Sequence, residues 1–176
     1  MTTRLRPVAL TDTDRLFSWR NHPDIRRWMF NQEVLLYENH KQWLQSLSQR
    51  KDFYGLIFEW QQEPIGFASF TLLGSEHVAE WGFYLSPFID RSTEKMRGVG
   101  SALGAAMVNY GFTELQLHKI YGQVIADNIR SLQFHEKMNF VKEGCLKDHY
   151  YNGASFLNVY CFGLLRDCWQ PSAVIN

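Results

Sequence analysis

The residues best suited to chemistry lie where an apolar stretch gives way to a long helical pattern. The run 95–100, Lys-Met-Arg-Gly-Val-Gly, combines two cations with two glycines directly before that pattern. Because glycine has no Cβ, the backbone N–H groups of this run can turn toward a ligand and approach it closely. A helix that begins at once adds its own unpaired N–H groups and the positive end of its dipole. The run therefore predicts a site for a phosphate or pyrophosphate group.

Two common phosphate motifs do not fit this run. A dinucleotide fingerprint requires a third glycine where Leu103 stands, and a P-loop requires Gly-Lys-Ser/Thr, which is absent. Tight strand-to-helix turns also use glycine for structural reasons alone, so a purely structural turn stays open as an alternative.

Several other residues are unusual for their surroundings. Glu80 is a charge inside the otherwise apolar strand pattern 79–85, where a charge is uncommon unless it is solvated or functional. Arg20 stands where an apolar stripe meets a helix end. It is either a contact for a ligand or a solvated residue that caps the carboxyl end of the helix. The run 28–30, Trp-Met-Phe, is too bulky for one face of a regular element and predicts a groove or an interface. His40 lies on a helical apolar stripe, where a lone histidine is more often a core residue.

Apolar periodicity and turn residues predict the elements that position these residues. The expected strands are a short one near Leu5, then 53–60, 64–73, 79–85, 119–126, 140–145 and 155–165. The expected helices end before Pro23, cover 37–50, follow Gly98 and begin at Asn128. The early strands form an antiparallel meander, and the two later crossovers require parallel pairing, which predicts a mixed sheet of the α/β class.

Composition limits the class of protein. The 176 residues fit one domain, 1–176, and hydrophobic and aromatic contents of 45% and 15% exclude disorder. The formal net charge is zero, so we expect no nucleic-acid partner, and no apolar run is long enough for a membrane helix. The polar start without an apolar leader, and three cysteines without metal-ligand spacing, predict a cytoplasmic protein without a metal site.

Two motifs together resemble a known family. The run 95–100 is followed, one strand later, by Asn128-Ile-Arg-Ser131 and a helix running to Met138-Asn-Phe140. This arrangement resembles the acetyl-CoA-binding region of the GCN5-related N-acetyltransferases, the GNAT family. Lys95 and Asn139 depart from the commonest residues, although lysine keeps the charge and asparagine tolerates a left-handed helix cap. The resemblance implies the GNAT acyl-CoA N-acyltransferase fold, a central, mostly antiparallel mixed sheet of about seven strands flanked by helices.

The resemblance also implies a cosubstrate and an assembly. It implies that the protein binds acetyl-CoA, binds no metal and forms a homodimer, as many relatives do. The implied acetyl-CoA-binding residues lie on the central strand, on the glycine turn and at the start of the later helix: Phe83, Tyr84, Leu85, Lys95, Met96, Arg97, Gly98, Val99, Gly100, Ser101, Asn128 and Ser131.

The first half of the chain indicates the chemical class of the acetyl acceptor. The runs 19–23 and 28–30, with His40 and Trp43, are similar to family members of pseudaminic acid synthesis, which acetylate the 4-amino group of a UDP-linked amino-deoxy sugar. This similarity implies a UDP-amino sugar as substrate, with the arginine fork on the diphosphate. The implied substrate-binding residues are Arg20, Met29, Phe30, His40, Thr71 and Tyr84.

The family reaction assigns roles to three further residues. Glu80 is the expected base, through a water molecule, with Ser69 as a second relay. His135 stands seven positions after Asn128, where most relatives carry a tyrosine that protonates the leaving thiolate. Histidine donates a proton readily near neutral pH, and the alternative is that the thiolate needs no protein acid. No cysteine is placed as an activated nucleophile, so direct attack in a ternary complex is expected.

Two rival functions remain open from the sequence. One is the same fold acting on a polyamine or on a ribosomal-protein amino-terminus, and the other is a non-catalytic acyl-CoA-binding module. A polyamine site requires clustered carboxylates, whereas Glu33, Glu38 and Glu59 are scattered.

Overall fold

The computed structural model describes residues 2–169, which form two compact units by their internal contacts. Among these residues, the first unit comprises 2–71 and 82–103, and the second comprises 72–81 and 104–169. The division passes through one strand, Val78–Leu85, and one helix, Val99–Thr113.

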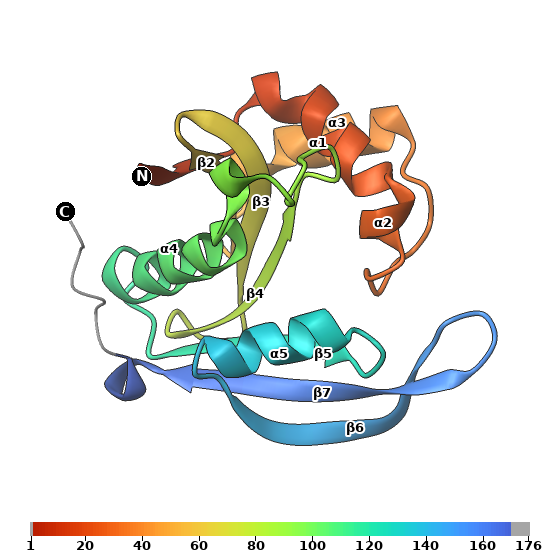
Figure 1. The fold of residues 1–176 in the computed structure, drawn as a ribbon, viewed down its shortest axis with the longest axis vertical. Coiled ribbons are helices and arrows are strands. Elements are labelled where there is room, and N and C mark those ends of the chain that lie inside the picture. The colour runs from red at the N-terminus through yellow and green to blue at the C-terminus, as the bar shows by residue number, and fades with distance from the viewer. Residues whose placement is uncertain (1, 170–176) are drawn as a thin grey trace. The chain divides into compact units, whose positions relative to one another are not determined.

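Seven strands and five α-helices make up the described chain (Figure 1). The strands are β1 (Thr3–Pro7), β2 (Phe53–Trp60), β3 (Glu63–Leu72), β4 (Val78–Leu85), β5 (Lys119–Ile125), β6 (Val141–Tyr151) and β7 (Phe156–Leu165). The helices are α1 (Thr13–Asn21), α2 (Pro23–Arg26), α3 (Tyr37–Ser46), α4 (Val99–Thr113) and α5 (Ile129–Lys137). The strand order is β1-β2-β3-β4-β5-β7-β6, which confirms the expected mixed sheet of seven strands.

The first unit places α1 and α3 on the antiparallel strands β1 to β3. β2 and β3 form a hairpin whose turn residues, Gln61 and Gln62, both have positive φ, as a two-residue turn between twisted strands requires. Apolar side chains from α1, α3, β2 and β3 build the core of this unit: Leu16, Trp19, Leu44, Ile57 and Phe67.

The second unit corrects one topological expectation. β4 and β5 are parallel, as the first crossover requires, but the second crossover does not place parallel strands side by side. β7 lies between β5 and β6 and is antiparallel to both. The final strand therefore lies between two strands that precede it in the chain, which the order of elements along the chain did not reveal.

β6 is also longer than the strand that the sequence predicted at 140–145. β6 extends to Tyr151; within it Asp148 has a φ of 48° and donates its N–H to the side chain of Asn158 at 2.9 Å. Residues 152–155 connect β6 to β7.

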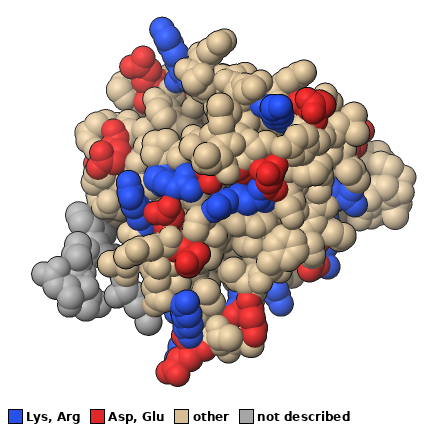
Figure 2. All heavy atoms as spheres, turned by 90° about the horizontal axis from the view of Figure 1, so that it is seen from above, with Lys and Arg blue, Asp and Glu red and all other residues tan. Residues whose placement is uncertain are grey.

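Charge is distributed without a dominant sign. Figure 2 shows basic and acidic side chains interspersed over the face that it presents, in keeping with the formal net charge of zero. Within residues 2–169, no helix is long and apolar enough to cross a membrane, and no group of histidine, cysteine and carboxylate side chains is arranged to hold a metal.

Candidate active site

The turn that enters α4 contains two glycines beside open space. Gly98 has a φ of 80°, which side chains rarely tolerate, and Gly100 follows in the first turn of the helix. A Cβ added at either glycine would meet nothing within 4 Å, so open space borders the backbone here. Ala102 N donates to Gly98 O at 2.9 Å, which is the first hydrogen bond of the helix.

The rest of the turn is anchored to the sheet of the first unit. The indole N–H of Trp60 donates to Lys95 O at 3.0 Å, while the Lys95 and Arg97 side chains are exposed. Val99 and Leu103 are buried and hold the start of α4 in place. Lys95 and Arg97 are thus exposed cations next to the glycines in the chain, and their role in binding a phosphate stays a prediction.

Tyr84 in the second half of β4 is positioned by packing. Its ring lies against Phe67, with 5.3 Å between ring centroids, and burial raises the pKa of its phenol above the ordinary value. Its main-chain oxygen lies only 3.1 Å from where a Cβ on Gly66 would stand, so glycine is required on β3 for this close approach. The neighbouring Phe83 is half-buried and Leu85 is buried.

Arg20 at the end of α1 is incompletely bonded. Its Nη2 donates to Asn31 O at 2.6 Å, whereas Nη1 is buried without a hydrogen-bond partner in the described chain. Burial lowers the pKa of the guanidinium, the nearby Tyr84 opposes this shift, and Arg26 adds to it. A buried N–H donor without an acceptor costs about 1 to 3 kcal/mol, more for a charged group. This donor is therefore a candidate contact for an anionic ligand.

Other residues implied for the substrate differ in exposure. Met29 and Thr71 are half-buried, and Phe30 is 47% exposed. His40 is only 4% exposed; its Nε2 lies 3.2 Å from Thr13 O and its ring packs beside those of Phe17 and Trp43. The structure therefore favours the core interpretation of His40 that the sequence left open.

Ser69 on β3 has a backbone partner. Its hydroxyl donates to Gly82 O at 3.4 Å, and a Cβ on Gly82 would lie 3.1 Å from the same hydroxyl. Ser69 and Thr71 are both half-buried and alternate with buried Phe70, so the two hydroxyl side chains share one face of β3.

Asn128 in the second unit is the N-cap of α5. Its Oδ1 accepts a hydrogen bond from Ser131 N at 3.2 Å, so the predicted Asn-x-x-Ser start of the helix is confirmed. The other end of the helix closes at Asn139, whose φ of 63° is the left-handed conformation expected of asparagine there.

His135 lies in an aromatic core rather than at a surface. It is 2% exposed and its ring contacts those of Trp81, Phe134, Phe140 and Phe162. Nε2 accepts the indole N–H of Trp81 at 3.0 Å, and Nδ1 faces Ser131 O at 2.8 Å. Since Nε2 accepts and Ser131 O has no proton to give, Nδ1 carries the hydrogen. This geometry does not favour proton donation to a leaving thiolate.

Glu80 lies half-buried in the first half of β4. Burial raises the pKa of its carboxyl above the ordinary value. Its strand neighbour is Tyr121 of β5, whose hydroxyl donates to Cys161 Sγ at 3.0 Å and accepts from Gln123 Nε2 at 3.0 Å. This polar group was not predicted from the sequence, although the polar residues at positions 119, 121 and 123 alternate as a signal for it.

Comparison with known proteins agrees with this fold and these motifs. Residues 3–141 match the family described as acetyltransferase (GNAT) domain, and the chain belongs to this family of acetyltransferase enzymes. Acetyltransferase PseH of Campylobacter jejuni is 28% identical over 141 residues, which cover 80% of this chain and 83% of that protein. Aminoglycoside N(6')-acetyltransferase type 1 of Klebsiella pneumoniae is 26% identical over 149 residues, 80% of this chain and 74% of that protein.

A solved structure supports the fold independently. The spermidine N-acetyltransferase from Vibrio cholerae, determined in complex with CoA and spermine, superposes with a TM-score of 0.84. The superposition covers 94% of this chain and 96% of that one at 20% sequence identity, which establishes the shared fold alone.

Proposed function

We propose that this enzyme transfers the acetyl group of acetyl-CoA to the 4-amino group of a UDP-linked amino-deoxy sugar, of the kind used in pseudaminic acid synthesis. The observation that carries the acceptor assignment is the buried Arg20 Nη1, which has no partner in the described chain. A diphosphate supplies charged oxygens that match an arginine fork. The similarity to PseH at 28% identity supports the same class of acceptor.

The residues at the start of α4 fit acetyl-CoA. The open space beside Gly98 and Gly100 admits a pyrophosphate against the backbone, and Lys95 and Arg97 offer balancing charge. Asn128 and Ser131 are proposed to bind the same cosubstrate, as the family resemblance implies. When bound, acetyl-CoA supplies an activated acetyl thioester, and a backbone N–H of 83–85 is proposed to polarise its carbonyl group.

Glu80 is the proposed general base. A carboxyl group whose pKa is raised by burial holds a proton more strongly, and is a stronger base toward an ammonium group, than an exposed one. We propose that it removes the proton of the acceptor amine through water, so that a neutral amine attacks directly. Ser69 is a weaker candidate for the relay because its hydroxyl is hydrogen-bonded to Gly82 O.

Apolar and hydroxyl groups are proposed to complete the acceptor site. Met29 and Phe30 offer apolar surface for the deoxy-sugar methyl group or the base, and Thr71 and Tyr84 offer hydroxyl groups. His40 is not included, because it is buried and hydrogen-bonded to Thr13.

A polyamine acceptor is the main rival, since spermidine acetyltransferases share the fold. Arg20 argues against it. A buried guanidinium with a free N–H donor repels a polycation, and no carboxylate bonds to it in the described chain.

The test is acetyl-CoA turnover, read as free thiol, with a panel of a UDP 4-amino sugar, spermidine and an amino-terminal peptide. Each charge-assisted hydrogen bond contributes about 1.5 to 3 kcal/mol. Arg20→Ala should therefore raise KM for the UDP sugar at least tenfold and leave acetyl-CoA affinity unchanged. Arg20→Lys should restore only part of the loss, because a point charge does not reproduce the fork. Faster turnover of spermidine or of the peptide by the unaltered enzyme would refute the acceptor assignment.

A further inference from the structure

Glu80 of β4 and Tyr121 of β5 lie side by side in the second unit. They are partners in the register of these two parallel strands and form the last pair of that register. Neighbouring strands are about 4.8 Å apart, and partner residues project their side chains from the same face of the sheet. Both side chains are half-buried. A carboxylate and an aromatic ring are therefore placed next to each other on one face.

This face is the one opposite α5. Gly122 follows Tyr121 in the chain. A Cβ on Gly122 would lie 2.7 Å from Trp81 Nε1 and 2.9 Å from His135 Nε2, so Gly122 faces the helix. Trp81 follows Glu80, and its ring packs against that of His135 on α5. Because successive side chains of a strand point to opposite faces, Glu80 and Tyr121 point away from α5.

Two hydrogen bonds engage the hydroxyl group of Tyr121. It donates to Cys161 Sγ at 3.0 Å and accepts from Gln123 Nε2 at 3.0 Å. Cys161 lies on β7, which flanks β5 on the side away from β4. The hydroxyl group is thus held away from Glu80, and the ring is the part of Tyr121 that lies beside the carboxylate. A ring that is already held in place loses little conformational entropy when a ligand binds.

The Glu80 carboxylate has no counterion in the described part of the chain. It forms no hydrogen bond or ion pair within residues 2–169, and burial raises its pKa while no cation there lowers it. Lys119, two positions before Tyr121 on β5, is bonded to Glu143 instead, with 2.6 Å between Nζ and Oε2. A half-buried carboxylate without a cation is stabilised when a ligand brings one.

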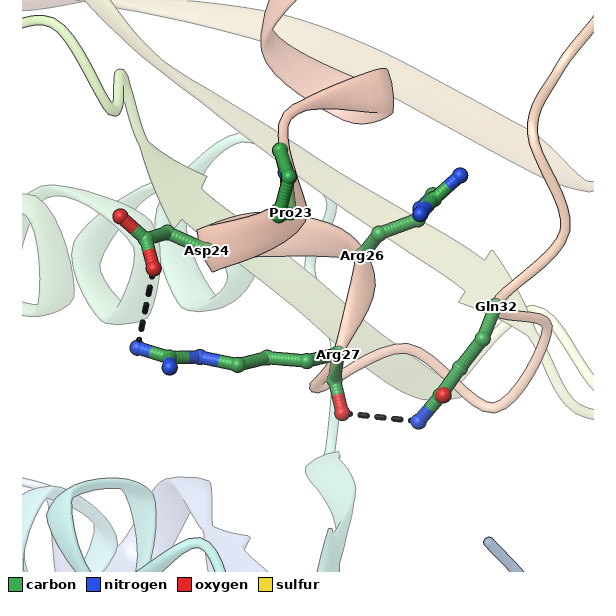
Figure 3. Close-up of a pocket in the computed structure, with 5 residues that line it drawn as sticks. All are labelled: Pro23, Asp24, Arg26, Arg27 and Gln32. Carbon is green, nitrogen blue, oxygen red and sulfur yellow. Dashed lines mark hydrogen bonds and ion pairs between the residues drawn. The ribbon is translucent and has the colours of Figure 1, made fainter. Parts of the chain in front are cut away.

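The surface depression at α2 in the first unit differs in this respect. Arg27 extends toward Asp24, with 3.1 Å between Nη2 and Oδ1, so these two charges neutralise each other (Figure 3). The depression is lined by Pro23, Asp24, Arg26, Arg27 and Gln32 (Figure 3). Its carboxylate is already paired, whereas the carboxylate of Glu80 can bind a cation that a ligand supplies.

We propose that Glu80 and the ring of Tyr121 together bind the ammonium form of the acceptor's amino group. This inference rests on the proposed role of Glu80 as the base and adds Tyr121 as a residue that determines specificity. The carboxylate attracts the ammonium group by its charge, and the aromatic ring attracts a cation within about 6 Å of its centre. Through the water proposed above, one N–H bond of the ammonium group breaks and one O–H bond forms on Glu80, which leaves the neutral amine.

Calorimetry on the full chain tests this assignment with two ligands, a UDP 4-amino sugar and the UDP sugar that carries a hydroxyl group at the same position. Saturating coenzyme A replaces acetyl-CoA, so that no turnover occurs. We expect the unaltered protein to prefer the amino sugar. Tyr121→Leu should weaken the amino sugar about five- to thirtyfold and leave the hydroxyl sugar unchanged, because only the ammonium group interacts with the ring as a cation. Glu80→Gln should remove most of the preference.

Two further variants separate the ring from the hydroxyl group and from packing. Tyr121→Phe keeps the ring and should bind both sugars nearly as the unaltered protein does. Tyr160→Leu is the matched control, because it removes a half-buried tyrosine ring from β7 at the position paired with Val124, on the α5 face. Urea unfolding establishes that each variant is folded, and Tyr121→Met replaces Tyr121→Leu if the latter is not.

The outcomes separate this inference from the proposed function. Unchanged affinity of Tyr121→Leu for the amino sugar, or an equal loss for both sugars, would overturn the role of the ring. An equal loss in Tyr121→Phe would assign the effect to the hydroxyl group and overturn it too. If the unaltered enzyme acetylates spermidine or a peptide instead, the nucleotide-sugar acceptor fails, and the KM of Tyr121→Leu for that amine decides this inference by the same criterion. If the enzyme acetylates no amine, both proposals fail together.

Discussion

The imidazole of His135 is held by a hydrogen bond at each nitrogen, which fixes its tautomer and removes it from solvent. We therefore expect His135→Phe to affect stability more than catalysis. The Trp81 indole N–H loses this acceptor in a buried place, so the free energy of unfolding should fall by about 1 to 3 kcal/mol. The value of kcat, measured where the variant is folded, should change less than tenfold. Urea unfolding and steady-state kinetics on the same preparation measure both.

Trp81→Phe provides the control for this residue-scale prediction. It removes the donor to Nε2, and the two variants with their double mutant yield the coupling energy of the pair. A decrease in kcat of about a hundredfold in His135→Phe with unchanged stability would establish the proton-donor role that the family resemblance implies.

The start of α4 is the element to which we assign the pyrophosphate of the cosubstrate, and Gly100 tests this assignment. Because a side chain at Gly100 would meet open space, Gly100→Val should fold normally and yet block the close approach of a phosphate to the backbone. We expect acetyl-CoA affinity to fall at least tenfold by calorimetry, with ligand-free stability changed by about 1 kcal/mol or less. Gly144→Val is the matched control, since a side chain there also meets open space, on β6. Unchanged acetyl-CoA affinity in Gly100→Val would place the pyrophosphate elsewhere.

For the whole molecule, each of the two units contains one buried histidine, His40 or His135. Burial lowers the pKa of both imidazoles, so the folded protein keeps them neutral while the unfolded chain takes up protons below about pH 6.5. Stability is therefore fully present above that pH and is lost as the pH falls, by up to about 1.4 kcal/mol per pH unit for each histidine. Glu80 acts in the opposite direction, because its raised pKa favours proton binding by the folded state.

Urea unfolding at pH 7.5 and 5.5 measures this acid sensitivity. The free energy of unfolding should be lower at pH 5.5, and the difference should shrink in His40→Phe. His77→Gln, at an exposed position, should leave the difference as it is. An equal difference in all three proteins would assign the sensitivity to other groups.

The pattern of elements followed from the sequence because local spacing dictates it. Gly98 and Asn139 stand where the chain needs positive φ, and Asn128 caps the helix that it opens. The order of the last two strands in the sheet could not be predicted from the sequence. The position of β7 between β5 and β6 depends on which strand edges are free to pair, not on residues that are neighbours along the chain.

The sequence by itself determined the family, the glycine turn at 98–100 and the candidate residues, since these depend on residue type and spacing along one segment. Only the tertiary structure decided which of the candidate side chains are placed where they can bind a ligand or take part in a reaction. His40 and His135 carry the right functional group, yet packing buries both and engages their nitrogens. Arg20 keeps a buried Nη1 without a partner because no acceptor within residues 2–169 reaches it. Burial and hydrogen-bond partners come from segments distant in sequence, so they cannot be predicted from the spacing of residues along the chain.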